Sequence, residues 1–297
     1  MQLWAGLMVY RVVLPDAPYP EKDTMKPSPT LKALDDLVPY ASEQDKLDRH
    51  INSFATQSFR DQADRDYIAA RLACRYELMP QFLWSSQQAI EKYLKAILLY
   101  NRIKAPKVGH DLEKAMELTS GLSFEIDLSL RSRKFLSYLS QYGEYRYIDV
   151  PYHVDGHVLI DLDLLVWELR RYCQVLNVFG KQLPAAEQAR LDEAASQLAQ
   201  SSKQPRHKFR LAAGELEKIL EKPDHPSRPA LLCNNFVYGI RKRKTVRAKN
   251  FLHFQNPYLI HYPEMLDELR KYVKISDKLA THYRDLLANK KAKLQTS

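Results

Sequence analysis

The most regular alternation of apolar and polar positions in the chain runs from Met79 to Asn101. Side chains that recur at intervals of three and four residues lie on one face of an α-helix. The apolar positions with this spacing are Phe82, Ala89, Ile90, Tyr93, Leu94, Ile97 and Leu98. The pattern predicts a helix with one face in a protein core. Glu91 and Lys95 fall on the other side, four residues apart with the acid first, so we expect a surface ion pair or a dimer contact there.

Helical spacing also occurs on both sides of this segment. It predicts a helical region that begins near Glu43 and resumes over 61–78, followed by helices from Leu112, over 128–142 and over 158–179 with a stop at Gly180. Pro80 fits the first turn of the helix predicted from Met79 to Asn101. His110 is expected to cap or pack at the start of a helix. Because the connections are short, the fold class we predict is all-α, an up-and-down bundle of four or five helices.

The flanks of the bundle differ from it in composition. Residues 1–44 carry six of the sixteen prolines and a β-like run from Leu7 to Leu14, which indicates an extended, partly disordered segment. We expect the bundle over 45–180, a polar helix and linker over 181–206, and a basic helical region over 207–297. The clearest helix of that last region is predicted from Pro263 to Lys293.

Charge is distributed unevenly along the chain. The formal net charge is +9, and the residues from Ser201 onward hold 21 Lys and Arg against 9 Asp and Glu. Six basic residues cluster at Arg241, Lys242, Arg243, Lys244, Arg247 and Lys249, flanked by Phe236, Tyr238, Phe251, Phe254 and Tyr258. Cationic side chains neutralise phosphates and aromatic rings stack on unpaired bases, so this composition suits RNA or single-stranded DNA. The alternative is an exposed basic loop beside a small aromatic core.

Several classes of protein are disfavoured. The three cysteines are far apart and form no CxxC pair, which indicates neither a disulfide framework nor a thiolate metal site and favours a reducing cytoplasm. The apolar run from Leu3 to Leu14 is interrupted by Arg11, so we expect no signal peptide or membrane span. No Gly-rich phosphate loop, HExxH, nucleophile elbow or paired-acid transferase motif occurs, and we expect no cofactor and no metal.

The segment from Arg146 to His153 (RYIDVPYH), which we expect to be a polar loop, holds the candidate chemistry. An imidazole titrates near neutral pH and can move a proton in either direction, while a guanidinium offers a planar fork of donors to a phosphate. His157 is a weaker substitute for His153. In the alternative interpretation, Arg146 caps the preceding helix or pairs with an acid of the loop. A second Arg–His spacing, Arg247 to His253, lies outside the bundle, and we attribute it to chance.

These residues together resemble a known family. The stretch QQAIEKYLKA from Gln87, then GHDL from Gly109, then Arg146 between two tyrosines before a last apolar helix, is similar to the HEPN domain. The resemblance implies a helical bundle that usually dimerises. In the ribonuclease members, an Arg and a His separated by four to six residues cleave RNA without a metal and leave a cyclic phosphate. It therefore implies that Arg146 holds the scissile phosphate and that His153 transfers the proton, with a second copy supplying a second His.

Two hypotheses follow. The first is a dimeric, metal-independent RNA endonuclease, a toxin or an antiviral defence effector, in which the basic C-terminal region holds RNA. The second is a non-catalytic HEPN module that binds nucleotide, RNA or a partner protein, which Tyr147 favours because nuclease members prefer another polar residue after the Arg. Toxin members carry a modifiable tyrosine where this chain has Asp155. A nucleotidyltransferase antitoxin would be a separate chain.

Overall fold

The computed structural model describes residues 42–106, 108–142, 152–176, 185–239 and 252–295. Ser42 caps the first helix of this part, because its Oγ accepts the backbone N–H of Asp45 at 3.2 Å. That helix, α2, spans Glu43–Phe54 and continues through a π-helical stretch, Ala55–Arg60, into α3, Asp61–Arg75. Tyr100 contacts the π-helical stretch, with its hydroxyl 2.6 Å from Thr56 Oγ1.

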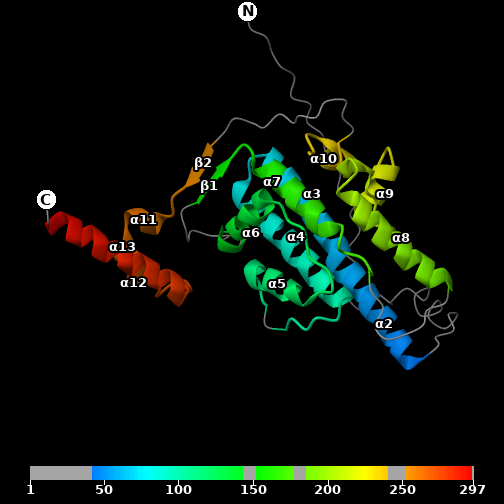
Figure 1. Cartoon of the computed structure of the whole chain (residues 1–297). Helices are drawn as coiled ribbons and strands as arrows, with labels where there is room; N and C mark the ends of the chain where they lie inside the picture. The colour runs from blue at the N-terminus through cyan, green and yellow to red at the C-terminus, as the bar shows by residue number, and fades with distance from the viewer. Residues whose placement is uncertain (1–41, 107, 143–151, 177–184, 240–251, 296–297) are drawn as a thin grey trace, which may run out of the picture. The chain divides into compact units, whose positions relative to one another are not determined.

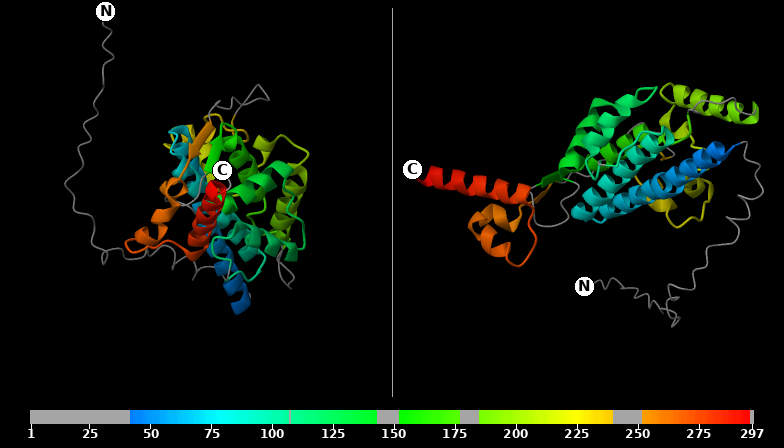
Figure 2. Two further views of the ribbon diagram at one scale, coloured as in Figure 1. Left: turned by 90° about the vertical axis from the view of Figure 1, so that its left-hand side faces the viewer. Right: turned by 90° about the horizontal axis from the view of Figure 1, so that it is seen from below.

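Helix α4, Met79–Tyr100, is the centre of the bundle (Figure 1). It contacts α3 along its length and also contacts α5, Leu112–Leu118, α6, Leu130–Tyr142, and α7, Val158–Arg170. Figure 2 shows the same neighbours around α4 from two further sides. All seven apolar positions of the predicted face are at most 1% exposed, because the neighbouring helices cover them. The all-α fold class is confirmed, and Pro80 lies in the first turn of α4 as predicted.

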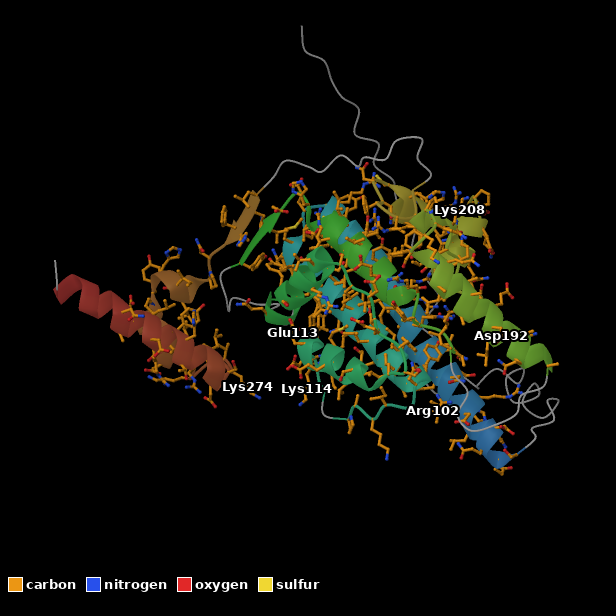
Figure 3. All side chains as sticks on the ribbon, viewed as in Figure 1. Arg102, Glu113, Lys114, Asp192, Lys208 and Lys274 are labelled. Carbon is orange, nitrogen blue, oxygen red and sulfur yellow. The ribbon has the colours of Figure 1, made fainter. Side chains whose placement is uncertain are left out.

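Local chemistry fixes the two ends of α4. Glu77 adopts a φ of 61° in the connection from α3, and Arg102 adopts a φ of 57° just after α4. The Arg102 guanidinium donates to Asp48 Oδ1 at 3.1 Å and to Asn52 Oδ1 at 2.9 Å, which ties the end of α4 to α2 (Figure 3). Next along the chain, the Asp111 carboxylate accepts the backbone N–H of Lys114 at 3.0 Å and so caps α5.

Helix α7 ends at Arg170, nine residues before the predicted end at Phe179. Buried arginines explain the difference. The Arg170 side chain is 1% exposed and bonded to two carboxylates. The Arg171 guanidinium donates to the carbonyl of Asp127 at 2.9 Å and to Ser202 Oγ at 2.8 Å. Because these polar contacts fix the backbone, the apolar periodicity that continues past Arg170 does not extend the helix.

The residues after α7 form two long helices, α8 and α13, and several short elements. They are α8, Ala185–Ser201, a 3-10 turn at Arg206–Lys208, α9, Glu215–Glu221, α10, Arg228–Leu232, strand β2, Leu252–Gln255, α11, Tyr258–His261, a 3-10 turn at Pro263–Met265, α12, Leu266–Leu269, and α13, Asp277–Gln295. Side chains of α9 and α10 belong to the core of the bundle. Side chains of α11, α12 and α13 form a second, smaller core. The single long helix predicted over 263–293 is therefore wrong, since residues 270–276 interrupt it.

A buried polar cluster joins the bundle to α9. Arg170 donates to both oxygens of Asp64, at 2.7 and 2.8 Å, and to both oxygens of Glu217, at 2.8 and 2.6 Å. Tyr93 Oη donates to the same Asp64 carboxylate at 2.6 Å. Burial raises the pKa of Tyr93, and Asp64 raises it further. Burial alone would raise the pKa of Glu217, but the ion pair with Arg170 outweighs it and holds that pKa below its usual value.

A second buried cluster joins the bundle to the residues after α10. Asp163 accepts from Tyr67 Oη at 2.7 Å, from Arg71, and from the backbone N–H of Phe236 at 2.8 Å. Asn235 Nδ2 donates to the Tyr67 hydroxyl oxygen at 2.8 Å. We call these two clusters together the buried clamp. Its charged groups are paired and hydrogen-bonded, as charges in a core must be.

Candidate functional site

His153 lies on a strand. Residues Tyr152–Asp155 form β1, which pairs antiparallel with β2 in the register Tyr152↔Gln255, His153↔Phe254, Val154↔His253 and Asp155↔Leu252. The prediction that the loop extends as far as His153 is therefore wrong for its last two residues, which belong to a strand. The partner strand is about a hundred residues away in sequence, and a strand of four residues has too little pattern of its own to be recognised. We call this pair of strands the ribbon.

The two faces of the ribbon have opposite character. Tyr152 and Val154 are buried, whereas His153 and Asp155 are exposed, as the alternation of side chains along a strand requires. Residues directly opposite each other share a face. The outer face therefore carries His153, Asp155, Leu252 and Phe254, and the inner face carries Tyr152, Val154 and His253.

The inner face and helix α6 fix β1 in place. The Tyr152 ring stacks on His253, with ring centroids 6.1 Å apart. Burial raises the pKa of Tyr152 to about 12, so this phenol stays protonated at neutral pH. Tyr138 Oη, from α6, donates to the backbone carbonyl of His153 at 2.7 Å. The backbone that carries the His153 side chain is therefore held by a neighbouring strand and a neighbouring helix.

A hollow of about 260 Å³ opens beside β1. Its lining comes from α6, β1 and α7 and consists of Arg131, Lys134, Phe135, Tyr138, His153, Val154, Asp155, Val158 and Asp161. Arg131 pairs with Asp161. Burial raises the pKa of Asp161, and the hydrogen bond from Arg131 opposes that rise. Within the described part of the chain, Lys134 has neither an ion-pair nor a hydrogen-bond partner, so its charge is available to a bound molecule.

The imidazole of His153 is exposed, and no hydrogen bond to its ring comes from any residue that the structure describes. Its ring lies beside that of Phe254, with centroids 6.1 Å apart and planes inclined at 35°. An imidazole in this setting can exchange protons with a bound molecule. By contrast His157, at the start of α7, donates its backbone N–H to Asp155 at 2.8 Å and acts in a turn.

Two parts of the predicted site lie outside the described residues. They are Arg146 and the basic cluster of Arg241, Lys242, Arg243, Lys244, Arg247 and Lys249. His253 is the histidine of the second Arg–His spacing. It lies on β2, next to the residue that pairs with His153, but on the other face of the ribbon. One chain therefore does not present these two imidazoles to the same side. Among the described residues, no group of three or more metal-binding side chains occurs.

Glu91 and Lys95 form the predicted ion pair, at 2.6 Å between Nζ and Oε1. The Glu91 carboxylate is not on the surface, however, since it is 6% exposed and also lies 2.8 Å from His110 Nδ1. His110 packs against this carboxylate, while the neighbouring Asp111 caps the helix. Within the described chain, these contacts give Glu91 a structural role in joining α4 to the start of α5.

No motif in the sequence pointed to Lys134 or Tyr138. Their signal was present only as spacing, because Arg131, Lys134 and Tyr138 recur at intervals of three and four along α6 and so share one helix face. That face becomes informative only once β1 is known to lie beside it. Phe254 was noticed as one of the aromatic residues near the basic cluster, but its position opposite His153 depends on the strand register.

Comparison with known protein families identifies a domain within the bundle. Residues 56–162 match the model of the HEPN domain, a range that includes α3, α4, α5, α6 and β1. The chain contains a HEPN domain. This family indicates a function that involves nucleotides or RNA. No curated protein and no solved structure matches the chain. Among the described residues, no helix is long and apolar enough to cross a membrane.

Proposed function

We propose that this HEPN protein is an RNA endonuclease that works without a metal, with His153 as the proton-transfer residue and Arg146 as the phosphate-binding residue. The supporting observation is the setting of His153 within the HEPN domain. Its imidazole is exposed while its backbone is held by Tyr138, and Lys134 lines the same hollow. A titratable group and a cation without a described partner, both facing solvent, suit the binding of a phosphodiester.

The reaction needs only proton transfer and charge stabilisation. An imidazole takes the proton of the ribose 2′-hydroxyl, and the 2′-oxygen attacks the adjacent phosphorus. The bond from phosphorus to the 5′-oxygen breaks, a second imidazole protonates that oxygen, and a 2′,3′-cyclic phosphate and a 5′-hydroxyl end result. Arg146 stabilises the negative charge on the phosphate oxygens as it grows. The second imidazole is His153 of another copy, so the active form is a homodimer.

The basic cluster from Arg241 to Lys249 supplies the remaining affinity for RNA. Each phosphate that a Lys or Arg neutralises releases counterions, so binding should weaken steeply as salt is raised. Replacement of Arg241, Lys242, Arg243 and Lys244 by Ser should lower RNA affinity and flatten its dependence on salt. Filter binding at several salt concentrations measures both quantities. Equal affinity and equal slope for this variant and the wild type would remove the cluster from the proposal.

The test of catalysis is incubation of purified full-length protein with mixed RNA in EDTA. Wild-type protein should produce fragments that end in a cyclic phosphate, whereas Arg146→Ala and His153→Ala should lose at least a hundredfold in rate, the lower end of what general acid–base groups contribute, roughly 10²–10⁴-fold. His157→Ala is the matched control and should keep most activity. Cleavage that survives both main substitutions, or that requires magnesium, contradicts the proposal.

A second function has specific support. No described side chain orients the ring of His153, whereas catalytic imidazoles are commonly held by a third group, and Tyr147 follows the candidate arginine. Both observations favour a non-catalytic HEPN module that binds RNA, nucleotide or a partner protein. The same assay separates the two, because such a module binds RNA and yields no fragments.

A nuclease without sequence selectivity would harm its own cell, so we infer a toxin or an antiviral defence effector under external control. Induction of the wild-type gene should stop growth, and the His153→Ala form should be tolerated. A nucleotidyltransferase antitoxin, if one acts here, is a separate chain. Harmless induction of a protein that cleaves RNA in vitro would argue against the toxin role.

A further inference from the structure

The outer face of the ribbon exposes an aromatic ring in a specific place. Phe254 is 64% exposed, although a phenylalanine is normally among the more buried residues. It lies directly opposite His153 in the strand register, so the two rings project from the same face. Leu252, the next outward residue of β2, is 58% exposed. A large apolar surface is therefore presented to solvent beside the imidazole.

The aromatic surface continues along the chain. Tyr258 is the first residue of α11 and comes three residues after the ribbon in sequence. Tyr262 comes directly after α11, and both tyrosines are about half exposed. Their ring centroids are 4.8 Å apart, with planes inclined at 31°. Exposed rings close to one another are typical of proteins that bind single-stranded nucleic acid, because every unpaired base has a π-face that can stack on them. In a duplex those faces are already covered.

Charge in the hollow that His153 lines favours a nucleic acid over an apolar partner. The hollow next to His153 contains Lys134, whose ammonium group is without a described partner, and Arg131, whose charge is balanced by Asp161. A nucleotide has a flat apolar base and a phosphate at a fixed distance from it. Phe254, whose ring lies next to that of His153, and Lys134, which lines the same hollow as His153, match these two parts in kind.

We propose that the outer face of the ribbon is a stacking platform for one unpaired RNA base, with Phe254 stacking on the base and Lys134 binding the adjacent phosphate. The role of the platform rests on the proposed nuclease function, because its purpose is to position the ribose next to His153. Phe254 is thus a positioning residue. It comes from β2, outside the matched HEPN residues 56–162, so the domain alone lacks this part of the site.

The test is binding of full-length protein to a short 2′-O-methyl RNA that carries 2-aminopurine. The methyl group removes the nucleophile, so the RNA cannot be cleaved, and stacking on an aromatic ring quenches the fluorescent base. Wild type should quench it. Phe254→Ala should lose the quenching and bind about fivefold to a hundredfold more weakly, the loss that corresponds to one stacked base. Phe254→Trp should retain both properties. Tyr272→Ala, which removes an aromatic ring that is 76% exposed elsewhere, should behave as wild type.

Lys134 is tested by the salt dependence of the same binding. Lys134→Gln should lower the slope of log affinity against log salt by about 0.7, the value for one phosphate contact on a single strand. Lys208→Gln is the matched control, because Lys208 is exposed and lies away from the hollow's lining (Figure 3). An unchanged slope for Lys134→Gln contradicts the assignment of this residue.

The results distinguish the platform from the nuclease. If Phe254→Ala quenches and binds like wild type, the platform is wrong, whether or not the protein cleaves RNA. If Phe254→Ala loses quenching and the wild type never cleaves RNA, the platform stands and the nuclease proposal fails. Because Phe254 is exposed, its substitution should leave the thermal unfolding midpoint unchanged, so weaker binding with an unchanged midpoint reports the lost stacking. Quenching that disappears equally in Tyr272→Ala would also contradict the platform.

Discussion

The buried clamp and the outer face of the ribbon both combine residues of the HEPN domain with residues that follow it. In the clamp, Arg170 donates to both Asp64 and Glu217, and the charged atoms find partners at hydrogen-bond distance. On the ribbon, His153 meets Phe254, and the imidazole, together with nearby Lys134, keeps its hydrogen-bonding capacity unused within the described chain.

This contrast separates architecture from function. A saturated buried charge has nothing left to offer a ligand, and it is costly to disturb because the remaining charge would be left in the core without a partner. An exposed imidazole beside an exposed ring adds little to stability and can bind something else. Strongly perturbed ionisable groups are often taken as signs of an active site. Among the described residues, burial raises the pKa of Tyr67 and of Tyr93 well above the ordinary value, and both belong to the clamp, whereas the candidate site lies elsewhere.

The largest effect on stability is expected for Arg170→Ala. Removal of the guanidinium leaves Asp64 and Glu217 as two uncompensated carboxylates in the core, which should cost about 3–5 kcal/mol of unfolding free energy. Urea denaturation followed by circular dichroism measures it. The more exposed pair of Arg131 and Asp161 offers a comparison, since solvent reaches the Arg131 guanidinium and Arg131→Ala should cost about 0–1 kcal/mol. Similar losses of unfolding free energy for the two variants would show that the clamp stabilises the fold no more than the Arg131–Asp161 pair does.

A smaller effect is expected from acid. The pKa of Glu217 in the folded protein is below the ordinary value of 4.5, so its ionised form stabilises the fold. That contribution is complete above about pH 4.5 and is lost as the pH falls through the folded-state pKa. Glu217→Gln should therefore be less stable than wild type at neutral pH, and the difference should narrow below pH 4.5. A constant difference across that range would show that Glu217 is not held ionised by Arg170.

The smallest effect on stability is expected for His153→Ala. The side chain is exposed and has no described hydrogen bond, so the free energy of unfolding should change by less than about 0.5 kcal/mol, as for other surface substitutions. Thermal unfolding measures the change. If this variant unfolds much more readily than wild type, His153 belongs to the architecture, and any loss of RNA cleavage in it would be explained by instability.

Local pattern predicted the helices of the bundle well and their ends less well. The apolar face of Met79–Tyr100 is the buried face of α4, because periodicity alone determines which side of a helix faces a core. The end of α7 could not be predicted. It depends on Arg170 reaching Asp64, 106 residues away in sequence, and nothing near Arg170 indicates that partner.

The candidate site was predictable only in part. A histidine before an apolar helix drew attention to His153, but the pairing of β1 with β2 is a contact between distant segments that no short motif encodes. That pairing brings Phe254 next to His153 and sets His253 on the opposite face. An aromatic residue in a basic region looks the same in sequence whether it is buried, as Tyr238 is, or exposed, as Phe254 is.

The buried clamp also constrains the order in which the chain can fold during synthesis. Asp64, Tyr67 and Arg71 leave the ribosome long before Asn235, which is 168 residues beyond Tyr67. Until that later segment emerges, a closed bundle would hold Arg71 and Asp163 without the backbone groups of Ala230, Cys233 and Phe236 that bond to them. Translation, at about 5–20 residues per second, therefore gives the early helices roughly ten to thirty seconds in which only a loose form is favourable. An incomplete chain is therefore kept from reaching its final packed form before the segment that completes the clamp has been synthesised.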